Sequence, residues 1–200
     1  MRNAEATKER ILEAALAEFS AHGIAGARVD RIAQAARCNK NLIYIYFEDK
    51  ETLFTTVLRK HLMRIHEEQP FTPDDLPGFA AKVFDWAMAN PDLMRLMAWS
   101  ALEQQAKDKV ERVAALEGKV AALTEAQNTG RVGTAFPPDF LLIAVMSLAT
   151  AWSAASPIGS SLAPKATERP AALRESISEA VGLLANAGKG ARAQVRSKKR

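Results

Sequence analysis

Side chains able to contact a nucleic acid gather in the segment that follows residue 39. Four of them recur on one face of an expected helix, at the i, i+1, i+4 and i+5 spacing: Lys40, Asn41, Tyr44 and Ile45. Lysine and tyrosine can bond to phosphate oxygens, asparagine can bond to an adenine edge, and an apolar side chain can contact a thymine methyl. The opposite face carries Ile43 and Phe47, which predicts its burial. The exposed face therefore predicts contact with DNA.

The helices before and within this segment would hold that face in place. An expected helix over Val29–Ala36 is joined by only a few residues to the next, Lys40–Tyr46. This is a helix-turn-helix arrangement, whose second helix enters the major groove of DNA. Asn39 is expected to cap that second helix. An earlier helix is expected from Thr7, its N-cap, to His22-Gly23, where glycine suits a left-handed position.

Helical periodicity continues through the rest of the chain, and no segment shows a convincing strand pattern. Further helices are expected at about 50–67, 73–90, 92–105, 107–128, 139–156 and 168–186, with loops at 130–138 and 156–164. The chain is therefore expected to be all-α, with about nine helices and no internal repeat.

Composition excludes several classes of protein. The chain has 200 residues, of which 48% are apolar and 25% charged, so disorder throughout is excluded. The single cysteine, Cys38, excludes a disulfide framework and a cysteine-rich zinc site. The polar N-terminus predicts no signal peptide, and the longest apolar run, Phe140–Trp152, is too short to span a bilayer. A soluble, cytoplasmic protein is the default expectation.

The charge is distributed unevenly. The formal net charge is +4, but residues 1–50 carry only +1 and residues 51–186 carry −3. Residues 187–200 hold six Lys/Arg and no acid, so the basic character belongs to this tail. The tail lacks apolar periodicity and is expected to be disordered, either as a solubilising end or as an arm that adds phosphate affinity.

A spaced pattern runs from Thr7 to Leu58, about a quarter of the chain. Its strongest carriers are Ala14-Ala15…Phe19, His22-Gly23, Val29…Ile32-Ala33…Ala35, Lys40, Tyr44-Ile45-Tyr46-Phe47 and Lys50-Glu51-Thr52-Leu53. This pattern resembles the DNA-binding domain of the TetR family of bacterial transcriptional regulators. The resemblance implies a helix-turn-helix DNA-binding domain over residues 1–50 and a larger helical domain for effector binding and dimerisation over 51–186.

The resemblance also implies roles for single residues. Lys40 would lie near the DNA backbone, Tyr44 and Tyr46 would donate to phosphates, and Lys50 would pair with a phosphate. Sequence reading would fall to Asn41, with Leu42 or Ile45 against thymine methyls. The expected DNA contacts are Arg28, Asn39, Lys40, Asn41, Leu42, Tyr44, Tyr46 and Lys50. The alternative interpretation is that the two tyrosines are ordinary half-buried aromatics.

The chain departs from the family pattern at four places. Arg37 replaces the usual turn glycine, at a cost of about 1 kcal/mol if the backbone there is left-handed. Arg28 stands where Ser or Thr usually caps a helix, which loses the cap but offers a charge to phosphate. Asn41-Leu42 replaces the common Gly-Thr pair, and Ile45 replaces a usually polar residue. The last three departures suggest an unusual operator sequence.

The C-terminal part is expected to supply a homodimer interface and an effector pocket, since a monomer would read only one half-site. The expected interface residues are Phe140, Ile143, Leu148, Trp152, Leu173, Ile177, Val181 and Leu184. The expected pocket residues are His61, Ile65, Val83, Trp86, Met94, Met97 and Trp99. The alternative interpretation of both sets is that they form part of the internal core. Few charges fall on the inner faces, which favours a small apolar or aromatic effector.

These features predict a ligand-responsive repressor that binds a pseudo-palindromic DNA operator and is released by a small molecule. Activation instead of repression and non-specific, architectural DNA binding are the alternatives. An enzyme is disfavoured: His61 and His66 are five residues apart and do not share a helix face, and no nucleophile or phosphate-loop motif is present. No cofactor and no metal site are expected.

Overall fold

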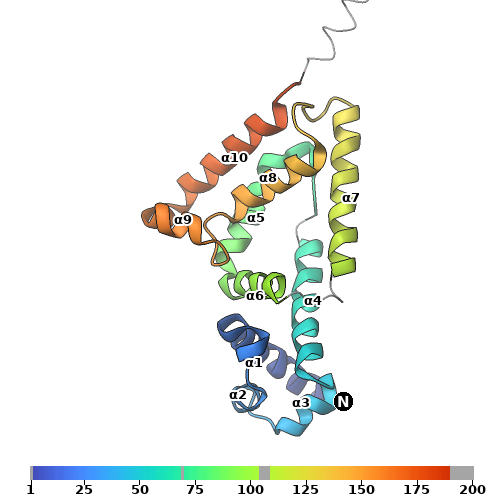
Figure 1. Ribbon diagram of the computed structural model, residues 1–200, viewed down its shortest axis with the longest axis vertical. Helices are drawn as coiled ribbons and strands as arrows, with labels where there is room; N and C mark the ends of the chain where they lie inside the picture. The colour runs from blue at the N-terminus through green and yellow to red at the C-terminus, as the bar shows by residue number, and fades with distance from the viewer. Residues whose placement is uncertain (1, 69, 104–108, 190–200) are drawn as a thin grey trace, which may run out of the picture. The chain divides into compact units, whose positions relative to one another are not determined.

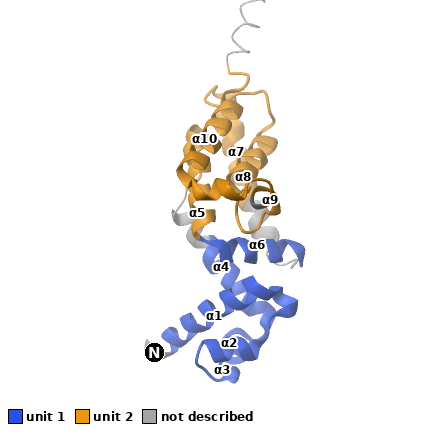
Figure 2. Cartoon of the chain, turned by 90° about the vertical axis from the view of Figure 1, so that its left-hand side faces the viewer, with its two compact units in different colours: residues 1–68, 90–108 blue, residues 69–89, 109–200 orange. Residues whose placement is uncertain are grey.

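The computed structural model describes residues 2–68, 70–103 and 109–189, with side chains for 4–62, 70–103, 115–159 and 161–189. The described residues form ten α-helices and no strand, which confirms the all-α expectation. They divide into two compact units, residues 1–68 with 90–108 and residues 69–89 with 109–200 (Figure 2). The units are not continuous in sequence, because residues 90–108 return to the N-terminal one.

The first unit contains five helices: α1 (Arg2–Gly26), α2 (Val29–Ala35), α3 (Lys40–Phe47), α4 (Lys50–Glu68) and α6 (Pro91–Leu102). Helix α1 packs against α2, α4 and α6. Phe19 of α1 and Phe54 of α4 are fully buried and meet edge to face, with ring centroids 5.2 Å apart. Such aromatic pairs stabilise by about 1 kcal/mol beyond their burial. Ile32 and Ala33 of α2 and Ile43 of α3 are all buried where the two helices pack in this unit.

Helix α1 is longer than expected and is kinked near its end. Thr7 is not its N-cap, since the helix already begins at Arg2 and Thr7 lies buried in its second turn. Ala4, Glu5 and Ala6 are good helix formers and extend the helix backwards. Gly23 has φ 65° and ψ −176°, so its positive φ is confirmed, but the helix resumes for one more turn to Gly26.

The turn between α2 and α3 follows the sequence expectation closely. Arg37 adopts φ 52°, its N–H donates to the Gln34 carbonyl at 3.1 Å, and the Cys38 N–H donates to the Ala33 carbonyl at 3.0 Å. These two bonds form a Schellman motif with arginine in the place that favours glycine. Asn39 then caps α3, its side-chain oxygen accepting from the Asn41 N–H at 2.9 Å.

The second unit contains the remaining helices. They are α5 (Leu76–Ala89), α7 (Lys109–Asn128), α8 (Pro138–Thr150), α9 (Pro157–Leu162) and α10 (Pro170–Asn186), with 3₁₀ turns at Pro73–Asp75 and Pro164–Glu168 (Figure 1). Helix α10 lies along α5, where Arg174 Nε bonds to Asp85 Oδ2 at 2.8 Å and the Ser178 hydroxyl donates to the Pro77 carbonyl at 3.3 Å. Helix α8 packs against α5, α7 and α10.

The chain between α8 and α10 differs from expectation. Helix α8 ends at Thr150 instead of continuing to about residue 156, and α9 forms within the expected loop. Pro157 occupies the first position of α9, where a proline is tolerated because the N–H that it lacks would have no partner within the helix. Among the described residues, no helix is long and apolar enough to cross a membrane.

Candidate nucleic-acid interface

Helix α3 presents the expected two faces. Ile43 and Phe47 are 1% and 3% exposed, so they anchor the helix in the core of its unit. On the other side Tyr44 is 42% and Ile45 71% exposed, and Asn41 is exposed as well. An isoleucine this exposed gains nothing from the fold of its own chain, which is what a contact residue for a thymine methyl requires.

The two lysines of this surface are already held by protein groups. Lys40 Nζ lies 2.9 Å from Asp30 Oδ1 of α2, and this bond raises the pKa of the Lys40 ammonium. Lys50 Nζ donates to the Ala27 carbonyl at 3.3 Å, just before α2. Both side chains keep part of their surface open. These bonds connect α2 to the start of α3, and the segment just before α2 to the start of α4.

The other expected contact residues are less uniform in exposure. Arg28 and Asn39 are exposed, whereas Leu42 and Tyr46 are half-buried. The Tyr46 ring meets the Phe47 ring at a centroid distance of 6.2 Å and a steep angle. The expected contacts therefore combine open side chains with aromatic ones that are partly fixed by packing.

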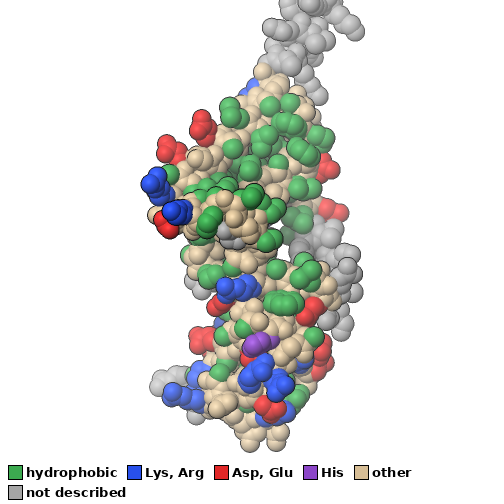
Figure 3. All heavy atoms as spheres, turned by 60° about the vertical axis from the view of Figure 1, so that its left-hand side comes forward, with side chains coloured by type: hydrophobic (Ala, Val, Ile, Leu, Met, Phe, Trp, Pro, Cys, Tyr) green, Lys and Arg blue, Asp and Glu red, His purple; other side chains and the backbone are tan. Residues whose placement is uncertain are grey.

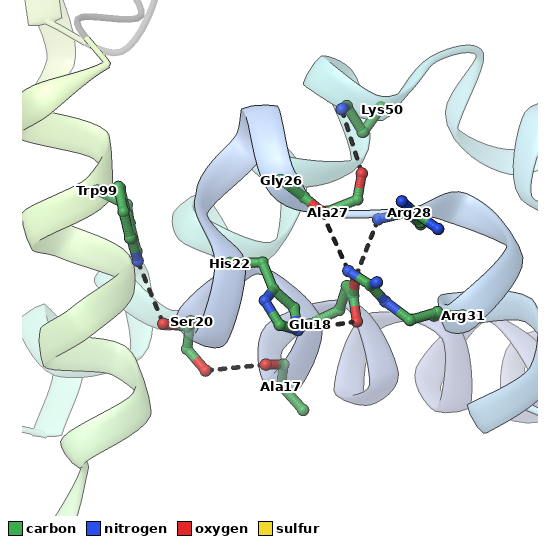
Figure 4. Close-up of polar contacts among 10 residues, drawn as sticks. All are labelled: Ala17, Glu18, Ser20, His22, Gly26, Ala27, Arg28, Arg31, Lys50 and Trp99. Carbon is green, nitrogen blue, oxygen red and sulfur yellow. Dashed lines mark hydrogen bonds and ion pairs between the residues drawn. The ribbon is translucent and has the colours of Figure 1, made fainter.

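Glu18 of α1 accepts a hydrogen bond from the backbone at the start of α2. The Arg28 side chain makes no cap, as expected, but its N–H donates to Glu18 Oε1 at 2.9 Å (Figure 4). The same oxygen accepts from Arg31 Nε at 2.7 Å and lies 2.5 Å from Arg31 Nη2, while His22 Nε2 is 3.9 Å from Oε2. Burial alone would raise the pKa of Glu18, but these bonds and the charges of Arg31 and His22 hold it below its usual value.

Sequence reasoning missed this arrangement. The available signal was the missing cap at Arg28 together with an acid on the preceding helix, ten residues earlier. Helical spacing alone does not say which residue of α1 faces α2, so Glu18 was one acid among several.

Trp99, one of the expected pocket residues, bonds α6 to α1. Its Nε1 donates to the Ser20 carbonyl at 3.2 Å (Figure 4). One turn later, the two carboxylate oxygens of Glu103 accept from the Ile24 N–H at 3.0 and 3.2 Å. These bonds hold the segment of α1 that contains the Gly23 kink. Met94 of α6 is buried in the same unit.

The remaining expected pocket residues fall in both units. His61 and Met97 are half-buried in the first unit, while Val83 is buried and Trp86 half-buried in the second. The side chain of Ile65 lies outside the described residues. The structure adds one residue that sequence reasoning did not consider: Lys119 of α7, whose Nζ lies 5.8 Å from the Phe79 ring centroid and whose pKa is lowered by burial.

The expected dimer residues also separate into two groups. Leu173, Ile177 and Val181 of α10 are buried in the core of their own chain, because α10 packs on α5, and offer no surface to a partner. Leu148, Trp152 and Leu184 are half-buried against the same core. Three large apolar side chains of α8 and α10 are open, namely Phe140 at 51%, Ile143 at 64% and Leu183 at 71%. Figure 3 shows hydrophobic side chains gathered over this unit.

No group of three or more His, Cys, Asp or Glu side chains in the described part of the chain could hold a metal ion. Cys38 is half-buried, and burial raises the pKa of its thiol, which disfavours the thiolate that a nucleophile needs.

Two family models match the chain. Residues 11–57 match the family described as bacterial regulatory proteins, tetR family, and residues 75–182 match the tetracyclin repressor-like C-terminal domain. The second match alone spans more than half of the 200 residues. The chain belongs to the TetR family. This TetR-family chain is therefore a DNA-binding transcriptional regulator and not an enzyme.

Relatives and solved structures agree with this assignment. The HTH-type transcriptional repressor SCO4008 of Streptomyces coelicolor is 42% identical over 159 residues, 78% of this chain and 82% of that protein. The HTH-type transcriptional repressor NicS of Pseudomonas putida is 30% identical over 50% of this chain and 51% of its own length. The crystal structure of SCO4942 from Streptomyces coelicolor is 36% identical, with a TM-score of 0.74 over 86% of this chain and 97% of that one.

Proposed function

We propose that this TetR-family regulator is a repressor that binds a pseudo-palindromic operator as a homodimer and is released by a small molecule. The observation that carries the DNA-binding part is the exposed face of α3, where Tyr44 and Ile45 stand open while Ile43 and Phe47 are buried. Repression is supported by the similarity to SCO4008 and NicS, both named transcriptional repressors. In this proposal residues 1–50 bind DNA and 51–186 serve dimerisation and effector binding.

The proposed contacts divide into positioning and reading. Arg28, Asn39, Lys40, Tyr44, Tyr46 and Lys50 would bond to phosphates and set the register of α3 on the duplex. Asn41 would read an adenine edge, and Leu42 and Ile45 would contact thymine methyls. Lys40 would turn from Asp30 toward a phosphate oxygen on binding DNA, and the exposure of both side chains leaves room for this movement.

The proposed dimer interface is the open apolar face of α8 and α10. Phe140, Ile143 and Leu183 would each leave water on association, at about 25 cal/mol per Å² of apolar surface buried. Two such faces, one from each protomer, would form a four-helix bundle. Two DNA-binding units held in one dimer would then read two half-sites, one helical turn apart.

The proposed effector is a small apolar or aromatic molecule, since the core of the second unit around Val83 is built from apolar side chains. An effector that binds better to a dimer with the wrong half-site spacing would shift the population away from the operator-bound state. A protein of this fold, the FadR regulator of Bacillus subtilis, was crystallised with stearoyl-CoA, whose acyl chain is apolar and whose CoA headgroup is charged; it is 18% identical, with a TM-score of 0.64.

A footprint on the DNA upstream of the protein's own gene tests the proposal. We expect one protected pseudo-palindrome, lost on addition of an active compound from a panel of aromatic and lipophilic molecules. Tyr44→Ala and Lys50→Ala should abolish the footprint while the dimer stays folded. Lys165→Ala is the control for Lys50→Ala: it also removes one lysine charge, but from an exposed position in the other unit, and it should leave the footprint in place. Uniform protection of any duplex would support non-specific binding instead. A transcription assay showing higher output with the protein bound would identify an activator.

A further inference from the structure

Glu18 has an unusual position for an acid in a DNA-binding unit. Its side chain is only 10% exposed, and it lies on α1 where that helix faces α2 (Figure 4). Its Oε1 receives the Arg28 N–H and the Arg31 side chain, and Arg31 Nη2 donates in addition to the Gly26 carbonyl at 3.0 Å. A buried carboxylate with this many donors holds its neighbours in one geometry.

The first consequence concerns the placement of α2. The N–H at the start of a helix has no acceptor within that helix, and for Arg28 the acceptor is Glu18 of another helix. Helix α2 is thereby fixed on α1, and α3 follows α2 after a turn of four residues. An altered angle of α2 would displace the exposed face of α3 from the base edges.

The second consequence concerns Arg31. In a helix-turn-helix the first helix crosses the DNA backbone, so an arginine of α2 is near phosphates of any sequence. Arg31 is directed back to α1 by its bonds to Glu18 and Gly26, and 41% of its side chain remains exposed. Without Glu18 its charge would be available to phosphate, which strengthens binding to every duplex alike.

We propose that Glu18 is a specificity-determining residue: it positions α2 for the operator and withholds Arg31 from phosphates. The inference rests on the proposed function, because it requires a preferred operator. It makes the two kinds of DNA affinity change in opposite directions. When Glu18 loses its charge, the affinity for the operator should fall and the affinity for unrelated DNA should rise.

The test compares Glu18→Gln with the parent protein by fluorescence anisotropy. Two duplexes of equal length are used over a series of salt concentrations, one carrying the footprinted site and one its scrambled sequence. We expect operator affinity to fall about tenfold, and affinity for the scrambled duplex to rise several-fold. Its salt slope should steepen by about 0.9 for each added phosphate contact. Glu13→Gln, the same charge change at an exposed position of α1, should leave the ratio of the two affinities within about twofold of the parent.

A second substitution separates positioning from simple loss of stability. In the Glu18→Gln, Arg31→Gln double variant, the freed charge is gone. Affinity for the scrambled duplex and its salt slope should therefore return to the parent values, while operator affinity stays low. If Glu18→Gln melts before the assay temperature, Arg31→Gln alone carries the test, and it should weaken operator binding without strengthening binding to scrambled DNA.

Different results would contradict the role of Glu18 and the proposed operator binding. Equal change on both duplexes in Glu18→Gln, or the same effect in Glu13→Gln, would overturn the role of Glu18. No preference of the parent protein for the footprinted duplex would overturn the proposed function itself.

Discussion

Replacement of Gly23 by alanine is the sharpest test of how the first unit is assembled. Gly23 adopts φ 65° and ψ −176°, a region of the Ramachandran map that is essentially reserved for glycine. A Cβ built there would lie 2.6 Å from Glu103 Oε1 and 2.9 Å from Trp99 Cε3. Glu103 and Trp99 are the two residues that bond α6 to α1. The substitution therefore strains the backbone and pushes α6 away from α1 at the same position.

The magnitude follows from these two costs. A residue forced into this backbone region costs about 1–3 kcal/mol. A methyl group inserted against close neighbours costs about 1–3 kcal/mol more, reduced where the flexible Glu103 side chain can turn away. We expect Gly23→Ala to lower the free energy of unfolding of the first unit by about 3 kcal/mol.

The measurement is urea unfolding, followed at matched protomer concentrations because the proposed dimerisation would contribute to the apparent stability. Gly118→Ala is the matched control: Gly118 lies within α7, and a Cβ there has no neighbour within 4 Å. In this position alanine should stabilise by about 0.5–1 kcal/mol, since it loses less backbone entropy than glycine. A Gly23→Ala protein as stable as its parent would refute the close packing of Trp99 and Glu103 of the α6 segment against Gly23.

Three further predictions address other parts of the molecule. Tyr44→Phe should weaken operator binding about a hundredfold in anisotropy titrations, from about 1.5 kcal/mol in each of two half-sites, and leave the melting temperature unchanged. The native pKa of Glu18 is depressed, so its stabilising contribution is present above the unfolded pKa of about 4.3 and is lost as pH falls through the lower native value. In urea unfolding between about pH 5 and pH 2, Glu18→Gln should therefore lose less stability with falling pH than the parent protein does. Deletion of residues 190–200 removes five Lys/Arg and keeps the Ala187 carbonyl, which accepts from the Ala135 N–H at 3.1 Å. The truncated protein should show a smaller salt slope of DNA binding and an unchanged preference for the operator. A loss of that preference would place specificity in the tail.

Local patterns predicted much of the DNA-binding unit correctly. The Asn39 cap, the positive φ at Gly23 and Arg37, and the buried Ile43 and Phe47 were all readable from the sequence. Each depends on residues within a few positions of one another, so backbone preference and helical spacing suffice to predict them. The length of α1 was misjudged, because a cap-forming residue such as Thr7 is also tolerated inside a helix. The helix after Thr150 was not predicted either.

The apolar stripe of α10 shows where local patterns stop being informative. The spacing of Leu173, Ile177 and Val181 identified an apolar face, and this face is indeed buried. Spacing does not tell whether the covering surface comes from the same chain or from a second one. The packing of α10 on α5 settled that these three residues close the core of their own chain, while Phe140 and Ile143 of α8 remain open.

Most of the helices, their buried faces and the exposed side chains of α3 could be predicted from the sequence, because these follow from interactions between near neighbours along the chain. The bonds of Trp99 and Glu103 to α1 could not be predicted in this way, since each joins residues that are 79 positions apart in the sequence. The same holds for Glu18, whose bonds to the Arg28 N–H and to the Arg31 side chain join α1 to the start of α2. A hydrogen bond between distant residues forms only where packing brings donor and acceptor within about 3 Å, and that proximity is a property of the whole unit.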